Sequence, residues 1–202
     1  MTDTAETAVT VIALTRHGQT DWNAARRLQG SSDVPLNDIG REQAVASSAR
    51  FTRGQWHSVV TSPLSRAVET GRIIADGLGI AVGLPHDDLR ERHYGEAEGM
   101  TLDAASALWD YDTYPGIEDR DLVAQRGLGS LAEIAAGLPG ASVIVVAHGT
   151  LIREVLQLIV GAPLPAIDNA ATSIVESTGS GWRVLTVNGE PYEHVRAAHV
   201  AR

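Results

Sequence analysis

Two short apolar runs dominate the hydrophobic pattern of the chain. Residues 9–14 are apolar or β-branched at every position, as expected of a strand buried on both faces, and they lead into Arg16-His17-Gly18. Residues 142–147 have the same character and lead into His148-Gly149. The pattern therefore predicts two buried strands, each followed by a histidine and a glycine.

Helical periodicity separates these runs from the weaker ones. Asn37 is a cap candidate for a helix that extends to about Phe51, and Ser62-Pro63 offers a serine cap and a first-turn proline for a helix that ends near Leu78, before Gly79. Further helices are predicted over residues 103–110, 121–138 and 151–160. Further strands are predicted over residues 58–61, 171–177 and 182–187, the last two as a hairpin around Gly179-Ser180-Gly181.

Strands that alternate with helices indicate an α/β fold, a three-layer α/β/α sandwich with a mainly parallel central sheet and one antiparallel edge strand. The chain has 202 residues, of which 44% are hydrophobic, so we expect a single domain over residues 1–202. About eight N-terminal and about twelve C-terminal residues are expected to be mobile. Ligands of such sheets bind beyond the carboxyl ends of the strands, so His17 and His148 are expected to share one crevice.

Composition excludes several kinds of chemistry. The chain has neither cysteine nor lysine, which rules out thiolate nucleophiles, cysteine-held metals, a P-loop lysine and a pyridoxal Schiff base. A net charge of -9 disfavours nucleic acid as a partner. No run reaches the roughly 18 apolar residues of a membrane span, and the first residues lack the pattern of a signal peptide, so a cytoplasmic location and no membrane partner are expected.

The residue types around the two histidines suit a phosphate ester. Planar arginine side chains bind phosphoryl oxygens through bidentate, charge-assisted hydrogen bonds, and Arg16 and Arg66 form the natural pair. His148 can donate a further hydrogen bond. Nearby arginines should lower the pKa of His17, which leaves the imidazole neutral and able to attack phosphorus. Gly18 and Gly149 allow the backbone to approach a ligand.

Arg16-His17-Gly18 is a weak motif alone, but several further blocks follow in order. They comprise residues 16–23, 27–30, 33–36, 40–44, 62–70, 91–95, Glu98-Gly99 and 145–149. Together they resemble the histidine phosphatase superfamily, with its phosphoglycerate-mutase-like fold. The resemblance implies a phosphohistidine on His17, a general acid and base at Glu91, and phosphoryl contacts from Arg16, Arg66 and His148. It also implies substrate contacts from Asn23, Arg92, Gly18, Gln29 and Gly149, and it implies neither a metal nor a cofactor.

The resemblance leaves the activity open between hydrolysis and isomerisation. Residues 91–95 match the wording of the phosphoglycerate mutases in this superfamily. Those mutases share a long, basic insertion before the second histidine, whereas here the stretch is short and residues 95–119 hold seven acidic residues and no arginine. Such a cover should admit water and repel a polyanion, so hydrolysis of a small-molecule phosphate monoester is the favoured hypothesis. A phosphoglycerate mutase is the alternative, and a catalytically silent binding protein on the same fold is the third.

Some residues remain without an assigned role in the sequence. His93 adjoins Glu91 and is open between a pocket residue and a bystander, whereas the other histidines outside the motifs are read as non-catalytic. The aromatic residues are open between a mouth for the leaving group and a cap on the core; they are Trp22, Tyr94, Trp109, Tyr111 and Tyr114. The sequence decides neither the substrate nor the oligomeric state.

Overall fold

The computed structural model describes residues 8–178 and 180–200. Its strands form one sheet in the order β3-β2-β4-β1-β5-β6-β7. The strands are β1 (Val11–Arg16), β2 (Ser58–Thr61), β3 (Ala81–Val82), β4 (Ser142–Ala147), β5 (Thr172–Thr178), β6 (Gly181–Val187) and β7 (Glu190–Pro191). The two strongest apolar runs, β1 and β4, are neighbours at the centre of the sheet.

The sheet is parallel on one side of β1 and antiparallel on the other. Strands β3, β2, β4 and β1 are parallel, whereas β5, β6 and β7 run antiparallel to their neighbours. The antiparallel part therefore has three strands where one edge strand is predicted. A tight hairpin can join only antiparallel strands, and the connections β5–β6 and β6–β7 are both of this kind.

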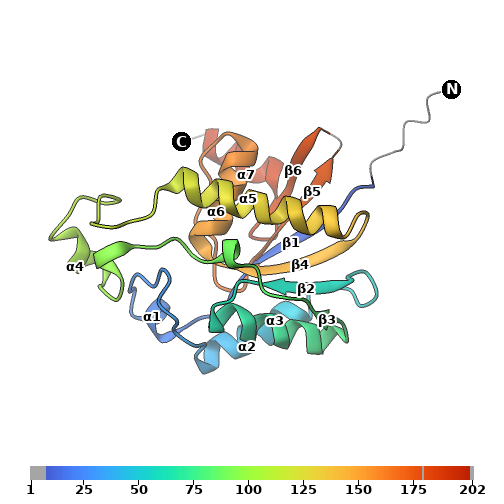
Figure 1. Cartoon of the computed structure of the whole chain (residues 1–202), viewed down its shortest axis with the longest axis horizontal. Coiled ribbons are helices and arrows are strands. Elements are labelled where there is room, and N and C mark those ends of the chain that lie inside the picture. The colour runs from blue at the N-terminus through green and yellow to red at the C-terminus, as the bar shows by residue number, and fades with distance from the viewer. Residues whose placement is uncertain (1–7, 179, 201–202) are drawn as a thin grey trace.

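Helices cover both faces of the sheet, which gives the three-layer sandwich that the sequence predicts (Figure 1). Helices α2 and α3 lie on one face, and α5, α6 and α7 lie on the other. The helices are α1 (Asp21–Ala24), α2 (Asp38–Ser48), α3 (Ser65–Leu78), α4 (Leu102–Ser106), α5 (Arg120–Gly137), α6 (Gly149–Val160) and α7 (Tyr192–Val200), with the 3-10 segments η1 (Asp87–Leu89) and η2 (Gly95–Ala97). None of the helices in the described part of the chain is long and apolar enough to cross a membrane.

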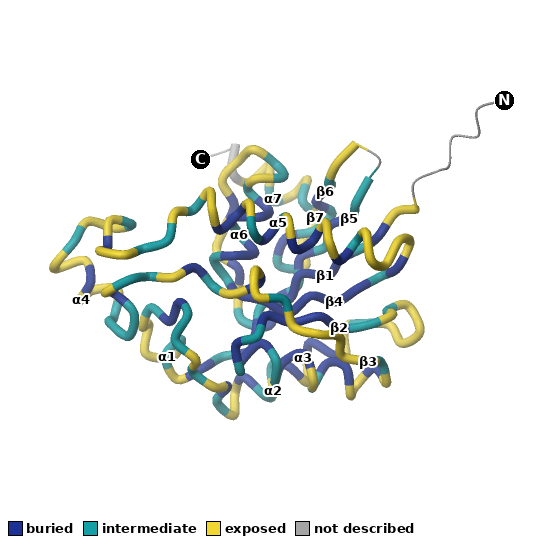
Figure 2. Tube along the Cα trace, in the orientation of Figure 1, coloured by how far each residue is buried: buried dark blue, intermediate teal, exposed yellow. Residues whose placement is uncertain are grey.

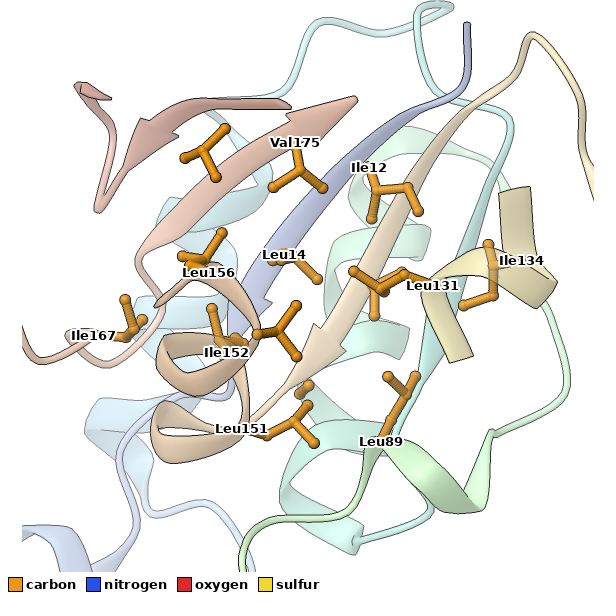
Figure 3. Close-up of a cluster of buried hydrophobic side chains, with 14 of the residues drawn as sticks. Ile12, Leu14, Leu89, Leu131, Ile134, Leu151, Ile152, Leu156, Ile167 and Val175 are labelled. Atoms are coloured by element: carbon orange, nitrogen blue, oxygen red, sulfur yellow. The ribbon is translucent and has the colours of Figure 1, made fainter. Parts of the chain in front are cut away.

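Successive core residues of the central strands lie on opposite faces of the sheet, and Figure 3 shows the cluster on one of these faces. In β1, Ile12 and Leu14 pack with α5 and α6, whereas Ala13 faces α3, and β4 alternates in the same way. Both strands are almost fully buried, as Figure 2 shows. In Figure 3, Leu151, Ile152 and Leu156 of α6 pack over this sheet. The apolar faces thus hold the ends of β1 and β4 in place.

The helices agree with the sequence except at four places, of which one is the four-residue α1, which was not predicted. The helix predicted from Ser62-Pro63 begins at Ser65 with Leu64 as its N-cap, because the Ser62 hydroxyl pairs with His148 instead. The helix predicted over residues 103–110 is the short α4. The C-terminal end, predicted to be mobile, forms α7, which packs against β6 through Tyr192 and Val195. Most of the predicted N-terminal tail lies outside the described residues.

Candidate active site

The ends of β1 and β4 bring His17 and His148 side by side. Arg16 is paired with Ala147 in the parallel register, and the amide of His17 donates to the carbonyl of Ala147 at 3.0 Å. The two imidazole rings lie 5.2 Å apart, centroid to centroid. Both residues are buried, at 2% and 0% exposure. Because β1 and β4 are paired in parallel and each is followed by a histidine, the sheet places His17 next to His148.

The imidazole of His17 is held in one tautomer. Its Nδ1 lies 2.6 Å from the carbonyl oxygen of Gly18. A carbonyl only accepts, so Nδ1 carries the hydrogen and Nε2 keeps its lone pair. Burial, followed by the charges of Arg16 and Arg66, holds the pKa of His17 well below its ordinary value. His17 therefore offers a neutral nucleophile at physiological pH.

His148 is oriented by the hydroxyl group of Ser62, the residue that follows β2. Its Nε2 lies 2.8 Å from Ser62 Oγ, and Ser62 Oγ also accepts from the amide of Leu64 at 3.3 Å. The hydroxyl can then donate to Nε2, which leaves the proton of His148 on Nδ1. Burial, then the charge of Arg66, lowers the pKa of His148 as well. Nδ1 is thus a neutral donor.

The guanidinium groups of Arg16 and Arg66 are anchored by backbone carbonyls. Arg16 Nη1 donates to Ile167 at 2.7 Å, and Arg66 donates to Gly30 and Ser32, both at 2.8 Å. Burial lowers the pKa of each guanidinium, although neighbouring charges keep both cationic.

Several donors at this site have no partner. The described residues contain five buried side-chain nitrogen or oxygen atoms without a hydrogen bond, and three of these are Arg16 Nε, Arg66 Nε and His148 Nδ1. Buried polar atoms are nearly always paired, so unpaired ones need an explanation. Three unpaired donors from residues around one nucleophile are explained by an anion that binds there.

A cavity of about 200 Å³ opens beside these residues. It is lined by Arg16, His17, Asn23, Arg27, Leu28, Gln29, Gly30, Arg66, Glu91, Tyr94, Gly149, Thr150, Arg153, Ala166 and Ile167. Thr20 fixes two of the amide side chains, since its backbone amide donates to Asn23 Oδ1 at 3.1 Å and its hydroxyl donates to Gln29 Oε1 at 2.9 Å. The amide nitrogens of Asn23 and Gln29 then remain as donors to a ligand.

Glu91 lies at the N-terminus of α6 and faces the same cavity. Its Oε1 accepts from the amides of Arg92 and Leu151, at 2.9 and 3.0 Å, and its Oε2 accepts from Thr150 at 3.0 Å. The carboxylate therefore caps the helix that follows His148, whose own side chain makes no cap. Oε2, which has a single amide partner, is left able to exchange a proton with a ligand.

Arg92 and Gly18 are the predicted substrate contacts that the structure does not place in the cavity. The guanidinium of Arg92 turns away and binds Asp112 and the carbonyl of Glu118. Gly18 packs on the backbone of α2, where a Cβ would come within 2.2 Å of the Gly40 oxygen. Gly149 does line the cavity, and its missing side chain makes room for Arg16, since a Cβ would lie 3.1 Å from Arg16 Nε.

The structure also locates His93 and most of the aromatic residues whose role the sequence leaves undecided. His93 is about half exposed and lies outside the cavity, with Nδ1 accepting from the amide of Gly95 at 2.9 Å. Of the five aromatic candidates, Tyr94 lines the cavity and its hydroxyl pairs with Thr150 at 2.6 Å. Trp109 and Tyr111 each pack edge to face on Tyr114, and Trp109 and Tyr114 belong to a small core, whereas Tyr111 is exposed.

Sequence reasoning missed Glu98, Arg27 and Arg153. Glu98 accepts from both the amides and the hydroxyls of Ser31 and Ser32, at 2.7 to 3.1 Å, and so holds the loop whose carbonyls bind Arg66. The only sequence signal was its place in the block Glu98-Gly99. Arg27 and Arg153 also line the cavity. Arg27 opens the matched block 27–30 but was given no role, and Arg153 gave no local signal, since a lone arginine on a helix is normally a solvated charge.

Comparison with known proteins identifies the family. The model of the histidine phosphatase superfamily (branch 1) matches residues 12–190. An uncharacterised phosphatase, PhoE of Bacillus subtilis, is 36% identical over 185 residues, which cover 89% of this chain and 95% of that protein. A probable phosphoglycerate mutase, GpmB of Serratia proteamaculans, is 31% identical over 187 residues, 85% of this chain and 86% of that protein.

A solved structure agrees with this result. A mycobacterial glucosyl-3-phosphoglycerate phosphatase superposes with a TM-score of 0.78 at 28% identity, over 89% of this chain and 99% of that one. The buried histidine pair and the two anchored arginines of this chain all lie within residues 12–190, the range that the family model matches. This chain therefore belongs to the histidine phosphatase superfamily.

Proposed function

We propose that this chain is a metal-independent phosphatase that hydrolyses a small-molecule phosphate monoester through a phosphohistidine on His17. The observation that carries the proposal is the state of His17. Its Nε2 lone pair is free, its pKa is depressed, and the side-chain donors around it are unpaired. Two fixed guanidinium groups supply the charge that a phosphoryl group needs, so no metal is required for that purpose.

In the first step, Nε2 of His17 attacks phosphorus and the bond from phosphorus to the ester oxygen breaks. Arg16, Arg66, Asn23 and Nδ1 of His148 would bind the phosphoryl oxygens. Glu91 would protonate the departing oxygen, which releases the alcohol. Each of these groups except His148 lines the cavity, and the ring of His148 lies 5.2 Å from that of His17, centroid to centroid.

In the second step, water replaces the alcohol. Glu91, now ionised, takes a proton from the water as its oxygen attacks phosphorus, and the bond between phosphorus and Nε2 breaks. Phosphate leaves and His17 returns to its neutral form. The same carboxylate thus serves as acid and then as base.

The composition of the segment that follows Tyr94 favours hydrolysis over isomerisation. A mutase must retain a doubly phosphorylated intermediate, and the segment over residues 95–119 offers acidic residues and no arginine to do so. With 3-phosphoglycerate and a bisphosphoglycerate primer, we expect free phosphate to form faster than 2-phosphoglycerate. The reverse result would establish the mutase alternative. The cytoplasmic location stays a prediction.

A phosphoenzyme test addresses both the activity and the nucleophile. With p-nitrophenyl phosphate and a chelator, the parent protein should release phosphate, and rapid acid-free quenching should trap acid-labile phosphate on the protein. His17→Ala should abolish both signals, because no other imidazole presents a free lone pair to the cavity in the described chain.

The control is His194→Ala, which removes an exposed histidine on α7 and should leave both signals unchanged. Label on a serine or aspartate would refute the assignment of His17. Absence of turnover with this ester and with a panel of phosphate monoesters, in a protein with a native circular-dichroism spectrum, would instead support the silent binding protein.

A further inference from the structure

We propose that Arg153 makes the outer part of the cavity a subsite for a carboxylate on the alcohol half of the substrate. The inference rests on the proposed phosphatase function and adds a substrate class to it, monophosphate esters whose leaving group carries one further negative charge. Arg16 and Arg66 already serve the phosphoryl oxygens. Arg153 lines the same cavity but has no part in that step.

Helix α6 directs Arg153 at the cavity. Gly149, Thr150 and Arg153 all line it, and their spacing of three and four residues puts them on one face of the helix. Side chains on a helix lean toward its N-terminus, so the guanidinium extends toward the end that Glu91 caps. That end of the helix dipole is positive and disfavours a cation. An anion that binds beside Arg153 would be attracted both by the guanidinium and by this end of the helix.

The guanidinium of Arg153 has donors to spare. Its one hydrogen bond within the described chain runs from Nη2 to Glu154 Oε1 at 3.2 Å, and the side chain is 22% exposed. A guanidinium has five N–H donors in a planar fork that matches the two oxygens of a carboxylate. The side chain can therefore keep its partner and still bind a ligand in bidentate fashion.

Arg153 is the last member of a series of linked ion pairs. Arg92 binds Asp112, Asp112 binds Arg120, Arg120 binds Glu154, and Glu154 binds Arg153. Three arginines alternate with two carboxylates, so the series carries one positive charge in excess. Glu154 is shared with Arg120, and the opposite end, Arg92, is buried away from the cavity. The one excess positive charge of this series is therefore available at Arg153, which lines the cavity.

The charges that line the cavity indicate how much negative charge the substrate carries. They are the charges of four arginines, Arg16, Arg27, Arg66 and Arg153, since Glu91 is protonated when it acts as the acid and His17 is neutral. A phosphate monoester brings a charge of about -1.5 to -2 at neutral pH. A positive charge of about two then remains beyond the ester, which leaves room for a further anion such as a carboxylate on the alcohol half. Leu28 and Ile167 offer apolar surface for a short carbon skeleton between the two anions.

The test compares two esters that differ at one group. 3-Phosphoglycerate has a carboxylate where glycerol 3-phosphate has a hydroxymethyl group. The parent protein should show a kcat/KM roughly tenfold to a hundredfold higher for 3-phosphoglycerate, the range expected for charged hydrogen bonds. Arg153→Gln should abolish this preference mainly through KM, since the bond lies away from the reacting atoms. Arg153→Lys should retain part of it.

Arg183→Gln is the matched control. Arg183 is also paired with a glutamate, Glu176, but lies on the hairpin of β5 and β6 outside the cavity. This variant should keep the full preference. Equal kcat/KM values for the two esters in the parent protein, or an equal loss on both in Arg153→Gln, would overturn the role of Arg153. Failure of the parent to hydrolyse these esters and p-nitrophenyl phosphate would overturn the proposed phosphatase function instead.

Discussion

Glu91 illustrates how one side chain can have two duties at a site. It closes the N-terminus of α6 by accepting from three amides, and it borders the cavity beside His17. The capping interaction explains why the carboxylate is positioned before any substrate binds. A carboxylate that is already oriented spends no binding energy on its own ordering.

Glu91→Gln should slow hydrolysis in proportion to how much the leaving group needs a proton. For an alkyl phosphate such as glycerol 3-phosphate we expect kcat to fall by about 10²- to 10⁴-fold, the usual contribution of a general acid. For p-nitrophenyl phosphate the first step should change little, because its phenolate leaves without a proton. Rates of phosphoenzyme formation by rapid quench would measure both, and an equal loss for the two esters would point to a merely structural role.

The residues that carry chemistry were predictable where they follow a strand or sit in a motif block. His17 and His148 needed only the two buried runs, and Arg66 needed the block around it. Arg92 was not predictable, because the direction of its side chain is set by Asp112 and Glu118, which come from a loop more than eighteen residues away. Arg92 follows Glu91 in the chain, but its guanidinium binds Asp112 and Glu118 of the segment over residues 95–119.

At the scale of elements, the two helices at the site have N-terminal caps from residues that are distant in the sequence. Helix α3 has Leu64 as its N-cap, and the amide of Ser65 is taken by Asp33 Oδ1 at 2.7 Å. Helix α6 has His148 as its N-cap and is closed by Glu91. Local patterns reveal a helix start only when the cap is local, as with Asn37 before α2. This is why Ser62-Pro63 predicts a helix start ahead of the observed one at Ser65.

The loop over residues 29–33 should depend on Glu98, which acts as a positioning residue for Arg66. Its side chain accepts five hydrogen bonds, from Ser31, Ser32 and the amide of Tyr94. Burial opposes ionisation, but these bonds outweigh it and lower the pKa of Glu98. Glu98→Gln replaces one acceptor oxygen with a donor and should loosen the carbonyls that hold Arg66. We expect KM for p-nitrophenyl phosphate to rise about tenfold, as when one charged hydrogen bond is lost.

Glu176→Gln provides the comparison, because its side chain is 12% exposed, against 13% for Glu98, yet it lies on β5 beside Arg183. Both variants should lose thermal stability to a similar extent, so the discriminating measurement is the inhibition constant for inorganic phosphate. It should weaken for Glu98→Gln alone. An unchanged constant would show that Glu98 does not act through Arg66.

At the scale of the whole molecule, an acidic protein concentrates positive charge in one place. The chain carries a net charge of -9, whereas four of its sixteen arginines line a single cavity. The sheet makes this possible, since the parallel strands β1 and β4 end together and the helices that follow β2 and β4 start at the same edge. The fold class and this edge could be predicted from the order of strands and helices. The hairpin of β5 and β6 was also predicted from the sequence, whereas β7, which has only two residues, and α7 were not.

The two buried histidines should also make the fold sensitive to acid. Their pKa values are depressed in the native state but near 6.5 in the unfolded chain, so below pH 6.5 the unfolded state binds more protons and the free energy of unfolding falls. Each histidine contributes up to about 1.4 kcal/mol per pH unit, so the pair contributes up to about 4 kcal/mol between pH 7 and 5. Urea titrations of the parent protein and of His17→Asn/His148→Asn would measure the difference in slope. The remaining histidines and the carboxylates with lowered pKa are common to both proteins and cancel. Parallel pH curves would mean that the two imidazoles are not held neutral, and a neutral His17 is what the proposed attack on phosphorus requires.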